Sequence, residues 1–407
     1  MKKAIKTFTL ATGIISMLIL VLISYYYYNL PNHYYITKNS NLNLYSYFNI
    51  TSIPSQAVQP VLSSNIIDGR FSNTFTLKLF DCVPIKEVTT QTVNAPVLVP
   101  GGEPFGVKLI SNGVMVVKLE NSSNGCPAKD CGIKCGDIVI SVNGKKVSSN
   151  KEISNAIMNT KGKTVPVVIC RNGQQMTLKL TPTLWEGSYR AGMWVRDSSA
   201  GIGTITFYDP STHLFGGLGH PVCDSDTGDT VHIKEGSAES VNIHGFNKSS
   251  AGDPGSLLGN FSGIDSIGEI YSNEDCGIFG RLKGSPSAKS SIPLGYRQEV
   301  HKGNATIYTT INGSKPKEYS IKIEEIDLIG DGTKNMVVRV TDKELLKQTG
   351  GILQGMSGSP IIQDGKLVGA VTHVFIRDTT MGYGVFADEM YNTALESSKL
   401  QENDLAS

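Results

Sequence analysis

The sequence is poor in charged residues, and the charges that it has nearly cancel. Only 18% of its 407 residues are charged, below the usual quarter, and 37 Lys and Arg against 36 Asp and Glu leave a net charge of +1. The chain as a whole therefore has no positive field for nucleic acid, and we expect no nucleic-acid partner. Hydrophobic residues, at 40%, exclude global disorder, and the 43 glycines are typical of a turn-rich β protein. Collagen, coiled-coil and multi-span membrane proteins are excluded as well.

One long uncharged run lies at the N-terminus. Three lysines within the first six residues precede residues 7–24, which carry no charge, and four tyrosines follow at 25–28. A helix over 7–28 is long enough to cross a bilayer core of ~30 Å, and flanking lysines favour the cytoplasmic side. We therefore predict a signal-anchor transmembrane helix over 1–28. A cleaved signal peptide is the alternative, although no small-x-small site follows the run. In both cases the rest of the chain is exported.

Cysteine is scarce and odd in number. The seven cysteines are Cys82, Cys126, Cys131, Cys135, Cys170, Cys223 and Cys276. An odd count in an exported chain leaves at least one thiol unpaired, so no full disulfide framework is implied. The group Cys126, Cys131 and Cys135 has spacings that match no common zinc pattern and no histidine nearby. We expect buried small residues there and no metal site.

Composition divides the chain into five parts. Residues 29–73 are rich in Asn, Ser and Tyr without a lasting period, which predicts a flexible tether. Residues 74–100 alternate in polarity and predict a strand-rich connector, and residues 101–183 contain hairpins and a helix. Residues 184–407 are Gly-rich, with short apolar runs and a closing helical pattern at Asp388–Lys399. The last part is predicted to be a β-barrel or sandwich, so the whole chain is mostly β with some α.

The fourth part, residues 101–183, has clear local signals. A strand is predicted at Val114–Leu119, the pairs Asn143-Gly144 and Asn172-Gly173 predict hairpin turns, and Ser149 with Glu152 has the form of a capping box. This order of strand, helix and hairpin resembles a PDZ domain of the bacterial protease-associated type. The residues that carry the resemblance are Pro127-Ala128, Cys131-Gly132-Ile133-Lys134-Cys135-Gly136-Asp137 and Ser141-Val142-Asn143-Gly144-Lys145.

A PDZ domain binds an extended peptide as an added strand and holds its terminal carboxylate in a loop of backbone N–H groups. By resemblance, that loop is formed by Pro104, Phe105, Gly106 and Val107. Two residues of the family pattern differ, because Cys131 and Cys135 stand where relatives carry Ala and Pro. The alternative is a PDZ core that serves only as a spacer.

The segment Gly355-Met356-Ser357-Gly358-Ser359-Pro360 is the sharpest chemical feature. Glycines on both sides of a serine allow a tight loop whose backbone N–H groups turn inward around an exposed hydroxyl. The pattern resembles the G-x-S-G-x-P loop of chymotrypsin-like peptidases, with Ser357 as nucleophile and the N–H groups of Gly355 and Ser357 as the oxyanion hole. The alternative is a hairpin that carries a solvated serine.

A serine nucleophile needs a base, for which histidine is the usual residue. Among seven histidines, His220 stands out because the glycines at 216, 217 and 219 allow close approach of the backbone. His373 lies on the strand after the serine loop and is expected to pack there. A third residue orients the imidazole. Asp342, 15 residues before Ser357, is one candidate acid.

Spacing alone leaves other acids open. Asp224, Asp226 and Asp378 are the rivals of Asp342. Asp224 also opens a segment that imitates a calcium loop, but Gly228 and Asp229 stand in the reverse of the order that such a loop requires. We expect no calcium there and no cofactor elsewhere.

Taken together, the chain resembles the SpoIVB peptidase family. Its most specific segments are Gly192–Thr204, Gly217–His220 and Gly350–Pro360. The resemblance implies a chymotrypsin-like β-barrel serine peptidase over 184–407 with His220, Asp342 and Ser357 as the triad. The acid would then lie 122 residues after the histidine, whereas in chymotrypsin-like enzymes it lies much nearer to it.

The resemblance also implies a biological role. Such a peptidase is exported into the space between the two membranes of a sporulating cell, cleaves itself and leaves its anchor. It then cuts a membrane-bound regulator, which activates intramembrane processing of the mother-cell sigma factor. The alternatives are an HtrA-like envelope protease, in which the PDZ domain follows the protease, and a non-catalytic, membrane-anchored PDZ scaffold.

Overall fold

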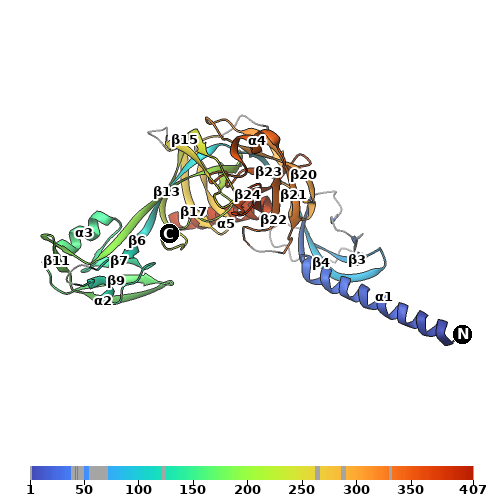
Figure 1. Ribbon diagram of the computed structural model, residues 1–407, viewed down its shortest axis with the longest axis horizontal. Helices are drawn as coiled ribbons and strands as arrows, with labels where there is room; N and C mark the ends of the chain where they lie inside the picture. Colours follow the sequence, from blue (N-terminus) through green and yellow to red (C-terminus); the bar gives the residue numbers. More distant parts are fainter. Residues whose placement is uncertain are drawn as a thin grey trace.

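The computed structural model describes residues 2–37, 42, 44, 50–54, 72–121, 125–261, 266–285, 290–329 and 332–406. In this part of the chain the protein is mostly β, with an N-terminal apolar helix, a PDZ region and two β-barrels. The PDZ region lies at one end of the elongated molecule, the barrels lie in the middle, and the N-terminal helix projects at the other end (Figure 1).

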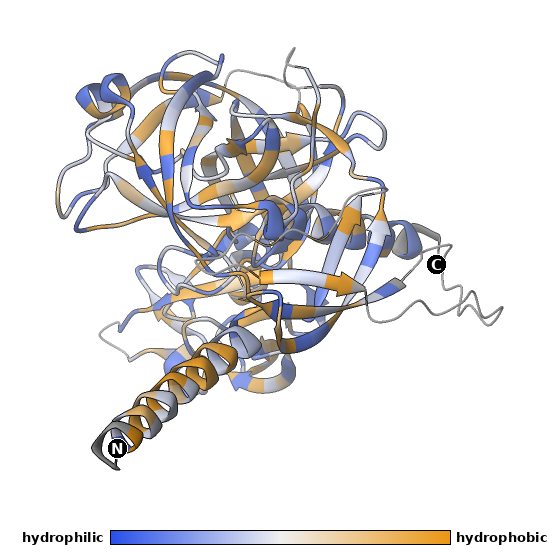
Figure 2. Cartoon of the chain, turned by 90° about the vertical axis from the view of Figure 1, so that its right-hand side faces the viewer, coloured by the Kyte–Doolittle hydropathy of each residue, from blue (hydrophilic) through white to orange (hydrophobic). Residues whose placement is uncertain are grey.

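The N-terminal helix α1 spans Lys2–Asn29, and its segment Ile5–Asn29 is long and apolar enough to cross a membrane. Its apolar surface stands clear of the barrels (Figure 2). A small sheet follows in the order β1-β4-β3-β2. Its strands are β1 (His33–Thr37), β2 (Ile50–Pro54), β3 (Ser72–Leu79) and β4 (Val83–Val93). The strands β1 and β2 and the first residues of β3 therefore lie within the expected tether. Tyr26 of α1 packs with Tyr34, Leu77 and Leu79 of this sheet in one core.

The PDZ region surrounds its own core, which includes Val139, Ile153, Ile157 and Val167. Its elements are α2 (Pro127–Asp130), β7 (Ile138–Val142), β8 (Lys145–Lys146), α3 (Asn150–Met158), β9 (Val165–Arg171), β10 (Gln174–Leu180), β11 (Thr183–Trp185) and β12 (Ser188–Arg190). The hairpin turns at Asn143-Gly144 and Asn172-Gly173 are confirmed, since both residues of each pair have positive φ. Ser149 caps α3 by accepting a hydrogen bond from the Glu152 N–H (3.2 Å).

The first barrel is a ring of six antiparallel strands in the order β6-β15-β17-β18-β14-β13, closed by pairing of β13 with β6. The strands are β6 (Pro104–Leu119), β13 (Met193–Tyr208), β14 (Leu214–Gly217), β15 (Ile233–Asn247), β17 (Gly268–Glu274) and β18 (Gly277–Leu282). Three shorter strands, β5 (Val97–Pro100), β16 (Ser256–Phe261) and β19 (Ile292–Pro293), pair at its margins.

The long strands β6 and β13 belong to two parts of the molecule at once. Residues 104–110 of β6 pair with the C-terminal half of β13 in the barrel, whereas residues 115–119 pair with its first residues in the PDZ sheet. The PDZ region is therefore inserted between two strands of the first barrel. This pairing joins segments about 90 residues apart, which no local sequence period reveals.

The second barrel is closed, with the order β20-β21-β22-β25-β24-β23. Its elements are β20 (Gly303–Thr309), β21 (Lys317–Ile326), β22 (Met336–Val340), α4 (Lys343–Thr349), β23 (Pro360–Gln363), β24 (Lys366–Val374) and β25 (Met381–Phe386), and the 3-10 helix η1 (Arg297–Glu299) precedes them. The closing helix α5 (Ala387–Ala406) packs against strands of both barrels.

Candidate active site

The serine loop lies in the second barrel, directly before β23. Gly355 and Gly358 have φ values of +98° and +95°, a backbone region that favours glycine. At Gly358 a β-carbon would also lie 2.0 Å from the Thr204 carbonyl oxygen of β13. The loop is thus pressed against the first barrel, where the Thr204 N–H donates to the Ser357 carbonyl (3.0 Å) and the Thr204 hydroxyl donates to the Gly355 carbonyl (2.8 Å).

Two backbone donors flank the serine hydroxyl. Across the described residues, neither the Gly355 N–H nor the Ser357 N–H donates a hydrogen bond to another protein group. The carbonyl groups of the same two residues are held by Thr204, which fixes the orientation of the loop. Both N–H groups are therefore available to a developing negative charge, as an oxyanion hole requires.

His220 comes from the first barrel, three residues after β14. Its Nδ1 lies 2.8 Å from the Pro221 carbonyl oxygen. Because a carbonyl can only accept, Nδ1 carries the proton and Nε2 is left as the basic nitrogen. Burial lowers the pKa of His220 below its ordinary value, against a smaller opposing effect of the Pro221 carbonyl. The neutral imidazole, which is the form that can accept a proton, is favoured.

Ser357 and His220 line the same cleft, whose volume is about 850 Å³. The Ser357 hydroxyl donates to the Thr372 carbonyl (2.6 Å), and no hydrogen bond joins Ser357 to His220 in the described structure. The hydroxyl must therefore turn from Thr372 before the imidazole can take its proton. One wall of the cleft is formed by residues 198–202 of β13.

The structure does not bring Asp342 into this cleft. Asp342 is the N-cap of α4, where its carboxylate accepts from the Leu345 N–H (2.9 Å). In the described structure the carboxylate stabilises a helix end and makes no hydrogen bond to His220, so the expected triad through Asp342 is not assembled in it. The rival acids are engaged elsewhere: Asp224 and Asp226 pair with Arg196, and Asp378 pairs with Arg339. No Asp or Glu of the described chain lines the cleft.

A second histidine, which the sequence analysis assigned to packing, occupies the cleft. The His373 ring lies beside the His220 ring, with centroids 4.6 Å apart and planes inclined by 34°. Burial, with smaller contributions from His220 and Lys334, lowers the pKa of His373 to about 4. His373 is therefore neutral near pH 7. The only sequence signal was its place on β24, the strand that returns past the serine loop.

The residues expected to form the PDZ carboxylate loop lie elsewhere. Pro104, Phe105, Gly106 and Val107 form the start of β6, paired with β13 on one side and, from Phe105 onward, with β15 on the other. The Phe105 ring is fully buried in the first barrel against Phe215. This segment has neither a loop conformation nor an open edge, so the assignment was wrong.

A groove of about 410 Å³ lies instead between α3 and the beginning of β13. Ile153 and Ile157 of α3 line it together with Met193 and Val195 of β13, and Arg190, which pairs with Glu186 (3.7 Å), also lines it. Among the described strands, residues 193–199 of β13 pair only with β6, so the edge of β13 at the groove is open. An open strand edge beside a helix is the geometry in which PDZ domains take up a peptide.

The cysteines form no cluster that could hold a metal. All seven are free thiols; Cys126 is buried, Cys131 half-buried and Cys135 exposed, so the expectation of burial fails for Cys135. Within the described ranges, no three His, Cys, Asp or Glu side chains are grouped as metal ligands would be.

Two β-barrels with a serine loop from one and a histidine from the other, and a PDZ region inserted between two strands of the first barrel, define a serine peptidase. The description "SpoIVB peptidase S55" matches residues 187–391, about half of the chain, and "PDZ domain" matches residues 105–181. The chain belongs to the SpoIVB peptidase S55 family.

Curated relatives match a short segment only. A putative zinc metalloprotease of Lactococcus lactis is 38% identical over 69 residues, and the serine protease Do-like HtrA of Bacillus subtilis is 36% identical over 78 residues. These matches cover 17% and 19% of this chain and 16% of each relative. The chain therefore corresponds to less than a fifth of the length of either relative.

Two solved structures show weaker likeness. The Rv3671c protease of Mycobacterium tuberculosis in its active form is 15% identical, with a TM-score of 0.28, over 48% of this chain and 72% of that one. The PDZ domain of an SdrC-like protein from Listeria monocytogenes is 21% identical, with a TM-score of 0.19, over 21% of this chain and 90% of that one.

Proposed function

We propose that Ser357 is the nucleophile of this peptidase and His220 its general base. The observation that carries the proposal is that the two side chains, from different barrels, line one cleft beside two unbonded N–H groups. The lowered pKa of His220 and the proton on its Nδ1 favour a basic Nε2. In this scheme the Pro221 carbonyl fixes the tautomer, a task that an aspartate performs in other serine peptidases.

The mechanism follows from these positions. The Ser357 hydroxyl turns from Thr372, gives its proton to His220 Nε2, and its oxygen attacks a peptide carbonyl carbon. The resulting oxyanion accepts hydrogen bonds from the N–H groups of Gly355 and Ser357. His220 then passes the proton to the leaving amine. Water, activated by the same imidazole, hydrolyses the acyl-enzyme.

For the cellular role, we infer an exported endopeptidase of sporulation that is anchored by α1. Membership of the SpoIVB family and the apolar N-terminal helix support this role. Its substrates are itself and a membrane-bound regulator, whose cleavage activates intramembrane processing of the mother-cell sigma factor. Self-cleavage N-terminal to the barrels releases it from the membrane into the space between the two membranes. The groove beside α3 takes up an extended peptide or a chain terminus.

Self-cleavage tests the proposal. The full chain, its Ser357→Ala variant and its His220→Ala variant are incubated in detergent micelles and followed by gel, mass and N-terminal sequencing. We expect the wild type to trim itself and both variants to stay whole. Equal trimming of all three would assign the cutting to a contaminant and favour a non-catalytic PDZ scaffold.

A further inference from the structure

The strand β13 connects the peptide groove with the catalytic cleft. Its first residues, Met193–Val195, form one wall of the groove, and residues 198–202 form a wall of the cleft. Farther along, Thr204 holds the serine loop through Gly355 and Ser357. One backbone strand therefore joins the groove to a wall of the cleft and to the serine loop.

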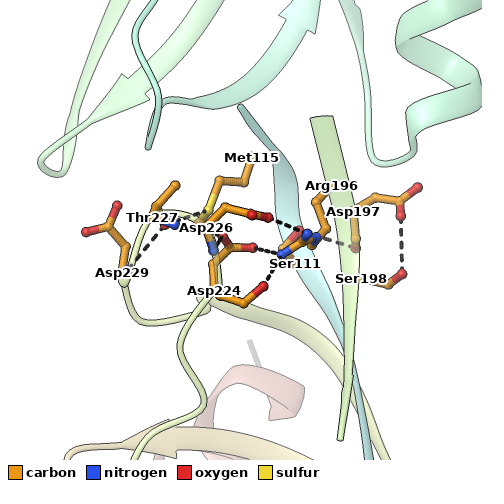
Figure 3. Close-up of polar contacts among 10 residues, drawn as sticks. Ser111, Met115, Arg196, Asp197, Ser198, Asp224, Asp226, Thr227 and Asp229 are labelled. Carbon is orange, nitrogen blue, oxygen red and sulfur yellow. Dashed lines mark hydrogen bonds and ion pairs between the residues drawn. The ribbon is translucent and has the colours of Figure 1, made fainter. Parts of the chain in front are cut away.

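Arg196 lies between these two walls and binds the loop that carries His220. Its Nη1 donates to Asp224 (2.7 Å) and its Nη2 to Asp226 (2.5 Å), as Figure 3 shows. The Asp224 carboxylate is buried and accepts further hydrogen bonds from the N–H groups of Asp226 and Thr227. Burial alone would raise the pKa of Asp224, but these donors and Arg196 lower it overall. A fixed carboxylate four residues after His220 thus ties its loop to β13.

The same loop also contacts the PDZ region. The Thr227 hydroxyl lies 3.6 Å from the Met115 sulfur on β6, in view in Figure 3. The backbone of Gly136 approaches Asp229 so closely that a β-carbon there would lie 2.9 Å from its carboxylate. The loop between His220 and β15 is therefore clamped between the PDZ region and the barrel.

The helix that forms one wall of the groove is bonded to Asp197, the residue next to Arg196. The N–H of Asn150, the first residue of α3, donates to the Asp197 carboxylate (2.8 Å). Asn150 also lines the groove, so a peptide strand that enters between α3 and β13 lies next to this link. The groove offers apolar Ile153 and Ile157, an open strand edge and the guanidinium of Arg190. These features fit an extended peptide with an apolar side chain and a carboxylate.

We propose that Arg196 is a positioning residue for His220, and that through Arg196 an extended peptide in the groove controls how fast the base activates Ser357. The inference rests on the proposed function, since it takes His220 as the base. The titratable groups that line the cleft with His220 are His373 on β24 and Cys223 on its own loop. Arg196 is the charged group that β13 contributes, and Lys334 acts on His373.

The first test measures activation of Ser357 directly. The full chain in detergent micelles reacts with a fluorophosphonate probe, and the labelling rate is recorded against pH. In Arg196→Gln we expect a plateau rate about tenfold lower and a rise that begins at higher pH, because a loosened loop lets water reach His220. Arg171→Gln is the matched control, since Arg171 pairs with the buried Asp137 (2.6 Å) inside the PDZ region. The control is expected to stay within twofold of wild type.

A rate and pH profile of Arg196→Gln equal to wild type would overturn the positioning role, and so would an equal loss in Arg171→Gln. Should Arg196→Gln fail to fold, Asp226→Asn removes only the exposed half of the pairing. It is expected to lower the rate about threefold, and an unchanged rate would again contradict the role.

The second test addresses the groove. Ser154→Trp places a bulky ring in it, and we expect the labelling rate to change at least threefold in the wild-type background but not in Arg196→Gln. No change in either background, or the same change in both, would refute the coupling. The proposed function fails in a different way: wild type is then not labelled, or Ser357→Ala is labelled equally.

Discussion

The imidazole rings of His220 and His373 lie 4.6 Å apart, centroid to centroid, at the junction of the two barrels. Two positive charges at this separation would repel each other in a partly buried site, so the pair holds at most one proton under ordinary conditions. This relationship links the pH dependence of activity to that of stability.

Activity is expected to persist below the ordinary pKa of a histidine. Burial lowers the pKa of His220, so the neutral base is present above that lowered value and is lost as pH falls through it. The rate of fluorophosphonate labelling should therefore rise with a midpoint below pH ~6.5. His301→Asn, which changes a histidine paired with Asp364 outside the cleft, should leave the midpoint unchanged. A midpoint above pH ~7 would contradict the geometry.

Stability should fall in acid partly because of His373. Its folded-state pKa of about 4 lies below the unfolded value, so the unfolded chain binds more protons between these values. The resulting contribution to the free energy of unfolding is complete above the unfolded pKa and is lost as pH falls through about 4. In urea titrations at pH 7 and pH 4.5, His373→Asn should lose less stability than wild type. An equal loss in both proteins would be evidence against a lowered pKa of His373.

Asp342→Ala should affect stability more than chemistry. Loss of the N-cap of α4 is expected to cost about 1 kcal/mol of unfolding free energy, measured by urea titration. The labelling rate should stay within about threefold of wild type, because the carboxylate does not line the cleft, whereas damage to a true triad aspartate costs ~10⁴-fold. Asp342→Ser retains a capping oxygen and should restore the stability.

Gly358→Ala should disable the serine loop. Positive φ alone costs a β-carbon about 1–2 kcal/mol, and here the β-carbon would also lie 2.0 Å from the Thr204 carbonyl. Gly365→Ala is the matched control, since Gly365 has φ of +74° but no atom within 4 Å of the added carbon. Only Gly358→Ala should abolish labelling. Equal activity of the two variants would show that the contact with β13 is unimportant.

Thr204→Val should slow labelling about tenfold, because the Gly355 carbonyl loses the hydroxyl that holds the backbone between the two oxyanion donors, the N–H groups of Gly355 and Ser357. The stability cost should be about 1 kcal/mol. Thr206→Val removes an equally buried hydroxyl that donates to the Gly358 carbonyl (2.8 Å) and should cost similar stability. If Thr206→Val slows labelling as much as Thr204→Val, the effect is a general loosening of the loop.

Local signals in the sequence predicted the elements well. Two kinds of feature depend on residues close together in the sequence: the turns at Asn143-Gly144 and Asn172-Gly173, and the cap by Ser149. Local sequence patterns therefore predict them directly. The PDZ region and the serine loop were found for the same reason. The glycines at 355 and 358 are required by local backbone angles.

Features that depend on distant contacts were not readable. No local pattern in the sequence predicts that Phe105 pairs with Gly203 of β13, so the start of β6 was mistaken for a PDZ loop. Spacing could not show that His373 lies against His220. The cap of α4 by Asp342 is a local contact with the Leu345 N–H, and it was missed although it spans only three residues. The pairing of Phe105 depends on closure of the first barrel, and the histidine contact depends on how the two barrels face each other. The periodicity of single strands contains neither.

The two shared strands also decide how the molecule comes apart. Because β6 and β13 continue from the PDZ sheet into the first barrel, removing the residues between them leaves two cut strand ends that a new turn must join. Deleting the PDZ region therefore also changes two strands of the first barrel. Loss of activity in such a deletion could not be assigned to loss of ligand binding. For the same reason the PDZ region and the first barrel share hydrogen-bond ladders and should melt in a single cooperative transition.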